Sequence, residues 1–142
     1  MTKSNGGRNR TKGHNAERHY ADYFRKVGFP LCKTSRAASR LHDDSGIDLC
    51  FTNPFNIQIK AGLQRGLNPS LELAKITTEV GKNFPKEYAE HTNYNIVIHK
   101  KEVGRGRKRN EFDEIVSMTF LDFIKIVEEL NELRTLKNTE DV

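Results

Sequence analysis

The sequence has no tryptophan, only two cysteines and no long run of apolar residues. Cys32 and Cys50 lie far apart and outside any CxxC pair, which disfavours a zinc site and gives no basis for a disulfide. The longest apolar stretches, near 96–98 and 120–127, are far shorter than the roughly 20 residues that a membrane span needs. No apolar segment follows the basic start, so a secretory signal is not expected. These absences favour a reduced, cytoplasmic protein without a membrane partner.

Positive charge is gathered in two places along the chain. The net charge is +5, and basic residues without acids fill 1–12 and 104–110. Such clusters favour contacts with polyanions, of which the phosphates of nucleic acids are the commonest. The alternative is that both clusters are solvated segments kept basic for solubility. The candidate DNA contacts in the two clusters are Arg8, Arg10, Lys12, Arg105, Arg107, Lys108 and Arg109.

The spacing of apolar residues predicts three helices. The first covers residues 12–27 and ends at Gly28. The second begins at Pro69, with Asn68 as its N-cap. The third follows Thr119 to about residue 136. Its apolar face is expected to be core, with a dimer surface as the alternative: Phe120, Phe123, Ile124, Val127 and Leu130.

Short strands are predicted at 31–35, 46–52, 55–60, 94–99 and 115–118. Residues 46–52 and 55–60 alternate between polar and apolar, and Asn53-Pro54 between them is a turn signal, which predicts an antiparallel hairpin. The element order is α-β-β-β-α-β-β-α. The sequence therefore predicts one α/β domain over 12–137, a mixed sheet flanked by helices, between a flexible basic arm at 1–11 and a tail at 138–142.

The predicted hairpin carries the candidate chemistry. With the turn at Asn53, Asp48 lies opposite Gln58, and Lys60 shares their face; paired side chains in such a ladder have Cβ atoms ~5 Å apart. Carboxylate and amide oxygens suit Mg²⁺, and a metal beside a lysine suits phosphodiester hydrolysis. Glu17, at the border of the first helix's buried face, could add a carboxylate. Polar residues also alternate outward on any half-exposed hairpin, so the pattern alone leaves this open.

These motifs resemble the PD-(D/E)XK nuclease superfamily. Gly46-Ile-Asp48 followed by Gln58-Ile-Lys60 is similar to its core motif, and the upstream 12–17 and 36–39 segments resemble archaeal-type Holliday junction resolvases. The resemblance covers about residues 12–62. It implies a restriction-endonuclease-like fold, a homodimer, and Mg²⁺-dependent cutting of four-way DNA junctions in recombination and repair, with Mn²⁺ able to substitute.

The resemblance also implies roles for the hairpin residues. Glu17 and Asp48 would bind the metal, and the main-chain carbonyl of Ile59 would add a contact. Lys60 would be the catalytic lysine. Gln58 takes the position of the usual acidic ligand, and because its amide brings no charge, metal affinity should be lower.

The resemblance further implies that the loop before the hairpin handles DNA. Ser39 would lie near the scissile phosphate, and Arg36 and Arg40 would hold the backbone. Asp44 is a rival carboxylate without the strand geometry of Asp48, and His42 is expected to be a solvated loop residue.

Three functions remain open from the sequence. The first is a junction resolvase in the cytoplasm of a bacterium or archaeon, or carried by a phage and acting in the host cytoplasm. The second is a restriction-type or repair endonuclease on duplex or flap DNA. The third is a non-catalytic DNA-binding module on the same fold, for which Gln58 is the hint.

Overall fold

The structure, a computed structural model, describes residues 5–62, 67–86 and 93–140, with side chains from residue 10 onward. Within these ranges, no helix combines the length and apolar character needed to cross a membrane. The elements in chain order are α1 (Asn5–Val27), β1 (Lys33–Thr34), α2 (Ser35–Ala38), α3 (Arg40–Asp44), β2 (Leu49–Cys50), β3 (Phe55–Gly62), α4 (Pro69–Asn83), β4 (Tyr94–Lys101), the 3₁₀ turn η1 (Glu111–Asp113), β5 (Glu114–Ser117) and α6 (Phe120–Glu140).

The strands form two small sheets. β1 pairs antiparallel with β2, and the second sheet has the order β3-β4-β5. Its β3 and β4 run parallel, with Gln58 beside Val97, whereas β4 and β5 run antiparallel. The α/β class and a mixed sheet, both predicted from the sequence, are confirmed.

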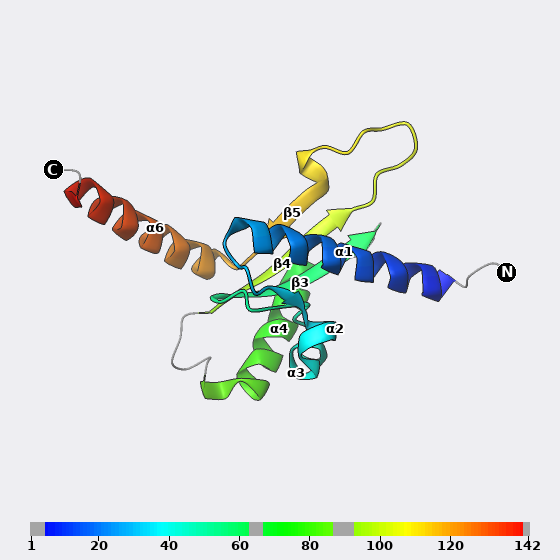
Figure 1. Ribbon diagram of the computed structural model, residues 1–142, viewed down its shortest axis with the longest axis horizontal. Coiled ribbons are helices and arrows are strands. Elements are labelled where there is room, and N and C mark those ends of the chain that lie inside the picture. Colours follow the sequence, from blue (N-terminus) through cyan, green and yellow to red (C-terminus); the bar gives the residue numbers. More distant parts are fainter. Residues whose placement is uncertain (1–4, 63–66, 87–92, 141–142) are drawn as a thin grey trace.

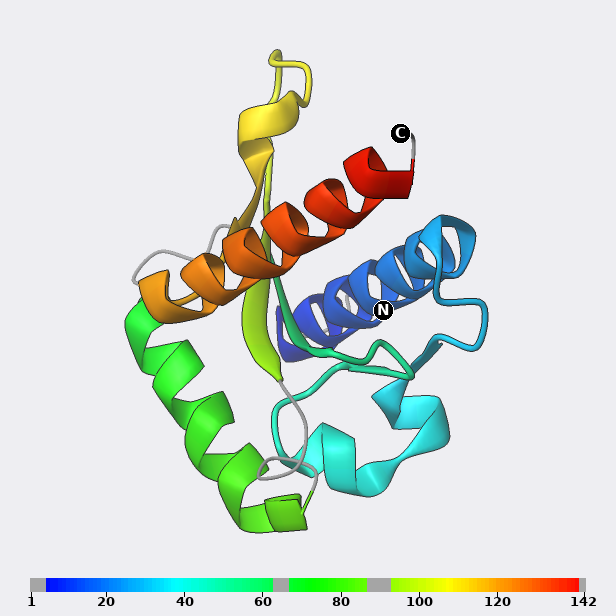
Figure 2. The same ribbon diagram turned by 90° about the vertical axis from the view of Figure 1, so that its left-hand side faces the viewer.

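Helices cover both faces of the three-stranded sheet. Figure 2 shows β3 and β4 between α1 on one side and α4 on the other. Ala16 and Tyr20 of α1 pack on Ile57 and Ile59 of β3. On the opposite face, α4 packs against Val97 and Ile47 through its buried stripe of Leu73, Ile76 and Val80. The core is therefore a pair of apolar layers that hold β3, the strand carrying Gln58 and Lys60, between two helices.

Helix α4 begins as its sequence predicts. The side chain of Asn68 accepts a hydrogen bond from the main-chain N–H of Leu71 at 3.2 Å, and Pro69 occupies the first turn. This side-chain bond satisfies one of the main-chain donors that a helix start leaves open. At the end of α1, Gly28 has a φ of 134°, a left-handed conformation in which glycine avoids the strain that a Cβ would cause.

Two predicted helix boundaries are wrong. α1 begins at Asn5 instead of residue 12, so the main chain of residues 5–11, predicted to be a flexible arm, is helical. α6 continues to Glu140, into the segment predicted to be a tail. Both additions are polar and lack apolar periodicity, but each further residue on an existing helix gains a hydrogen bond without a new nucleation step.

The regular hairpin predicted over 46–60 is not formed. The main-chain N–H of Asp48 donates to the Ile57 carbonyl at 2.7 Å, but the Asp48 carbonyl accepts from the Ser35 N–H at 2.8 Å. The chain thus changes its pairing partner at Asp48, and β2 continues beside β1 instead of β3. The alternating pattern of 46–52 predicts that Ile47 and Leu49 share one face of a strand. With the change of partner they are instead buried in opposite layers.

The last helix differs most from its prediction. Residues of α6 predicted to be core are exposed, with Phe120 at 77%, Phe123 at 49% and Leu130 at 47%. Figure 1 shows α6 extending away from the sheet beyond β5. Its apolar face is therefore not part of the core of this chain, and the alternative of a dimer surface stays a prediction.

Candidate active site

Asp48 is the best-anchored polar residue of the predicted hairpin. Besides its two main-chain bonds, its Oδ2 accepts from the main-chain N–H of Ile59 at 2.7 Å. Burial raises the pKa of Asp48 from 3.8 to about 7; the Ile59 N–H and the charge of Lys60 lower it, and the charges of Glu17 and Asp43 raise it. The Asp48 carboxyl, surrounded by charged groups, therefore still holds its proton in part of the molecules near neutral pH.

The charges that act on Asp48 come from three separate elements. Glu17 lies on α1 and is only 7% exposed, Asp43 lies on α3, and Lys60 lies on β3. Glu17 forms an ion pair with Arg36 at 3.2 Å, which offsets part of the charge of its buried carboxylate. The structure thus brings Glu17 and Lys60 into the electrostatic surroundings of Asp48.

Gln58 presents an acceptor without a donor. Its Oε1 is buried and has no hydrogen-bond partner among the described residues. Its Nε2 lies against Gly46, where an added Cβ would stand 3.3 Å away, so this glycine leaves the room that the amide occupies. A buried acceptor left without a partner costs about 1–3 kcal/mol, and a cation beside it would remove that cost.

The Ile59 main chain faces the same place. Its N–H donates to Asp48, and in an extended strand the C=O of a residue points to the same side as its N–H. The Ile59 carbonyl is therefore directed toward Asp48, away from the edge of β3 that pairs with β4. Asp48, Glu17, the Gln58 amide and this carbonyl all offer oxygen atoms, the ligands that suit a hard divalent cation.

Lys60 forms an ion pair with Glu72 that the sequence analysis did not predict. Its Nζ lies 3.8 Å from a carboxylate oxygen of Glu72, and both side chains are partly buried. Glu72 belongs to the first turn of α4, directly before the buried Leu73. The apolar stripe of α4 could have predicted this ion pair. The stripe indicates that α4 covers the face of β3 that carries Gln58 and Lys60, and this places the first turn of α4 close to β3.

Ser39 and its neighbours have structural partners. Ser39 Oγ caps α3 by accepting from the His42 N–H at 3.3 Å and lies 2.7 Å from His42 Nδ1. The His42 ring lies 4.6 Å from that of Phe84, so this histidine is half-buried, and its prediction as a solvated loop residue is wrong. Arg40 pairs with Asp44 at 3.6 Å at an exposed position, whereas Arg36 reaches the buried Glu17.

Side chains of the basic loop after β4 bond to acidic and main-chain groups at the two ends of the loop. Arg107 forms a bidentate pair with Asp113 at 2.6 and 3.0 Å, and Arg109 donates to the Lys101 carbonyl at 2.9 Å. Arg105 and Lys108 are exposed. Arg10 and Lys12 project from α1, while the side chain of Arg8 lies outside the described side chains.

We compared the chain with known proteins, and no protein-family model, curated protein or solved structure matches it. In the part of the chain that the structure describes, no three His, Cys, Asp or Glu side chains form a metal-binding group. A cation at Asp48 would therefore depend on amide and carbonyl oxygens as well as carboxylates.

Exchanging Gln58 for glutamate is expected to tighten divalent-metal binding. The new carboxylate would add a negative charge beside Asp48, and a gain of about tenfold corresponds to about 1.4 kcal/mol. Isothermal titration with Mn²⁺ would measure it, and Gln58→Ala should weaken binding instead. Equal Mn²⁺ affinity in all three proteins would show that Gln58 is not a ligand.

Proposed function

We propose that this chain is a metal-dependent DNA endonuclease with a restriction-endonuclease-like fold, and that four-way junctions are its substrate. The observation that carries the proposal is the buried Gln58 Oε1, which has no donor among the described residues and belongs to the strand that anchors Asp48 through the Ile59 N–H and carries Lys60. A structural core has no need of such an acceptor, whereas a cation site does.

The residues fit hydrolysis of a phosphodiester. Asp48, Glu17, Gln58 Oε1 and the Ile59 carbonyl would hold a divalent cation, which would supply Lewis-acid polarisation of the phosphate and an activated water. Lys60, on the same face of β3 as Gln58, would place its ammonium beside the reacting phosphate and stabilise the charge that develops there. Glu72 would hold that ammonium in position through the 3.8 Å ion pair.

DNA as substrate is supported by where the basic residues lie. α1 carries Arg10 and Lys12 on the helix that also carries Glu17, and Arg36 bonds Glu17 directly. A bound phosphate would offer Arg36 a second anion next to the metal site. Arg40 and Ser39 follow on the adjoining helix start and would contact the flanking backbone, as the resemblance implies.

A homodimer acting in the cytoplasm completes the proposal, since cutting two strands of a junction symmetrically needs two sites. The exposed large apolar side chains concentrate in β5 and α6, which offers a surface for a second copy. The residues of this apolar surface are Ile115, Val116, Phe120, Leu121, Phe123, Leu130, Leu133 and Leu136.

The test is a gel assay of a labelled immobile four-way junction, a matched duplex and a flap, each with and without Mg²⁺. We expect junction cleavage only with Mg²⁺, and a loss of about 10²–10³-fold in Lys60→Ala, the size of one lost electrostatic stabiliser. Lys75→Ala, at an exposed position on α4, is the matched control and should cut normally.

The outcomes separate the three candidate functions. Preference for the duplex or flap would replace the junction resolvase by a restriction-type or repair nuclease. DNA binding without Mg²⁺- or Mn²⁺-dependent cutting would point to a non-catalytic binding module, and would overturn the proposed activity.

A further inference from the structure

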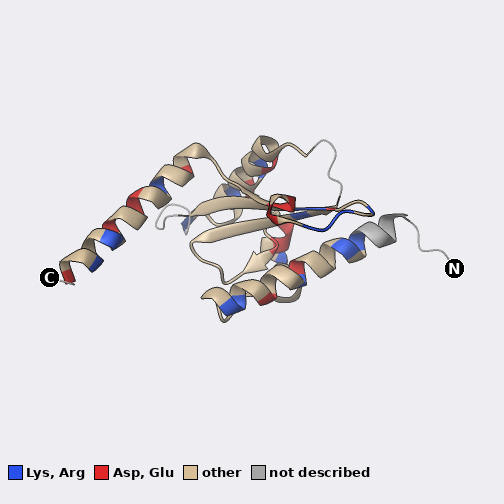
Figure 3. Cartoon of the chain, turned by 90° about the horizontal axis from the view of Figure 1, so that it is seen from above, with Lys and Arg blue, Asp and Glu red and all other residues tan. Residues whose placement is uncertain are grey.

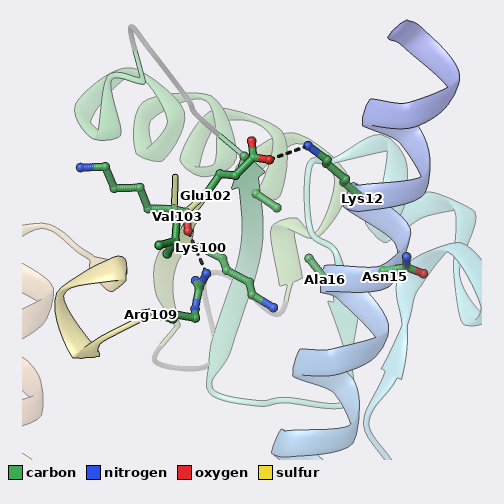
Figure 4. Close-up of a pocket in the computed structure, with 10 residues that line it drawn as sticks. Lys12, Asn15, Ala16, Lys100, Glu102, Val103 and Arg109 are labelled. Atoms are coloured by element: carbon green, nitrogen blue, oxygen red, sulfur yellow. Dashed lines mark hydrogen bonds and ion pairs between the residues drawn. The ribbon is translucent and has the colours of Figure 1, made fainter. Parts of the chain in front are cut away.

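A hollow of about 400 Å³ lies between α1 and the ends of β3 and β4, and none of the candidate metal ligands lines it. Its walls come from α1, from the ends of β3 and β4, and from the loop after β4. Figure 4 shows the residues that matter here: Lys12, Ala16, Lys100, Glu102, Val103 and Arg109. The hollow thus joins one residue from each of the two basic clusters that are far apart in the sequence.

The same neighbourhood is visible at the scale of the whole chain. Figure 3 shows the basic loop after β4 beside the N-terminal part of α1, and Figure 1 places both at the same end of the molecule. The ion pair of Lys12 with Glu102, at 2.8 Å, connects the two segments directly. Helix and loop therefore form one surface.

Two positively charged side chains, Lys100 and Arg109, line the hollow. Arg109 donates to the main-chain carbonyls of Lys101 at 2.9 Å and Asp113 at 3.3 Å, which fixes its guanidinium. Figure 4 shows Lys100 extending from β4 toward α1. The Lys100 ammonium has no ion pair with any residue for which the structure describes side chains, whereas Arg109 also approaches Glu114 at 3.8 Å. Glu114 is the cross-strand neighbour of Lys100 but bonds the Tyr20 hydroxyl and approaches Arg109, so the Lys100 ammonium, next to a fixed guanidinium, is suited to bind an anion from outside.

We propose that this hollow binds a non-scissile phosphate of the DNA backbone. The inference rests on the proposed function for the identity of the ligand and adds where the strand is held. Ala16 in its wall directly precedes Glu17, and Ala61 directly follows Lys60. A strand with one phosphate at the active site would therefore have a neighbouring phosphate anchored by Lys100 and Arg109.

Glu102 is the one acid in the lining, and it opposes this binding. Its carboxylate forms the ion pair with Lys12. The side chain of Lys12 is 53% exposed and that of Glu102 is 41% exposed, so this ion pair adds little to the stability of the fold. An arriving phosphate must compete with Glu102 for Lys12. Removing the charge of Glu102 should therefore strengthen DNA binding, while removing Lys100 should weaken it.

Binding of a fluorescent four-way junction, followed by anisotropy in EDTA so that no cutting occurs, tests this on the full chain. We expect Lys100→Ala to bind about fivefold more weakly and to lower the salt slope by about one. Glu102→Gln should bind at least about threefold more tightly, by release of Lys12. Lys137→Ala, near the far end of α6, is the control and should match the wild type.

The two variants are expected to change DNA affinity in opposite directions, which separates the effect of the site from a loss of folding. A gain in Glu102→Gln cannot come from misfolding, and thermal melts would verify that Lys100→Ala is folded. If both variants bind like the wild type, or Glu102→Gln binds more weakly, the phosphate site is overturned while DNA cleavage at Asp48 stands. If the wild type binds no DNA, the site and the proposed function fall together.

Discussion

Asp48→Asn is expected to abolish cleavage and, at pH 8, to make the folded protein more stable. The carboxylate is needed to bind a cation, so we expect at least about a 10³-fold loss of Mg²⁺-dependent activity. The stabilisation follows from the pKa of Asp48, which burial raises to about 7. Asparagine keeps an oxygen that can accept from the Ile59 N–H but carries no charge to bury.

The sign depends on pH. A carboxyl whose pKa is higher in the folded state than in the unfolded chain binds its proton more tightly when folded. It therefore favours folding below pH 4 and loses that contribution as pH rises toward 7. With a shift from 3.8 to about 7, ionised Asp48 would cost up to about 4 kcal/mol above pH 7, at about 1.4 kcal/mol per unit.

Thermal melts of both proteins across pH 4–8 in EDTA measure this effect. We expect equal melting temperatures near pH 4 and a variant about 8–16 °C more stable at pH 8, since 1 kcal/mol shifts a chain of this size by about 2–4 °C. Adding Mg²⁺ should raise the melting temperature of the wild type alone. A variant that melts lower than the wild type at pH 8 would contradict the buried-carboxyl account.

The second large effect is expected on the apolar surface of α6. Leu130, Leu133 and Leu136 are spaced along its C-terminal half and are 47–64% exposed. In a symmetric dimer a single substitution is present twice, so Leu133→Glu would place two charges in the interface. We expect the dimer to dissociate with at least a 100-fold weaker affinity, about 2.7 kcal/mol.

Sedimentation equilibrium of wild type and variant measures this change. Thr135→Glu is the matched control because it adds the same charge on the other side of the helix, where Thr135 bonds only the Asn131 carbonyl. A wild type that sediments as a monomer at every concentration, or equal dissociation by both variants, would exclude this surface as the dimer contact.

Local patterns in the sequence predicted most of the fold correctly. Asn68 and Pro69 start α4, Gly28 ends α1, and the apolar run Ile96–Ile98 lies in a strand buried on both faces. These features depend on backbone chemistry and on apolar spacing within a few residues. The apolar face of α6 shows the limit, because periodicity identifies an amphipathic helix but not what covers it.

The candidate site was predictable in its members but not in its geometry. Asp48 was expected to lie opposite Gln58 in a ladder, but it bonds the main chain of Ile57 and Ile59 instead. Ser35 takes the Asp48 carbonyl, and Glu72 reaches Lys60 from α4. Both are contacts between distant parts of the chain, which no local pattern in one sequence encodes.

A crystal structure of the protein soaked in Mn²⁺, with anomalous scattering used to locate the ion, tests the central claim most directly. The account predicts a peak within coordination distance of Asp48 and Gln58 Oε1, on the side of β3 that the Ile59 carbonyl faces. A peak elsewhere with this place empty, or a Gln58 amide turned to a protein donor instead, would contradict it.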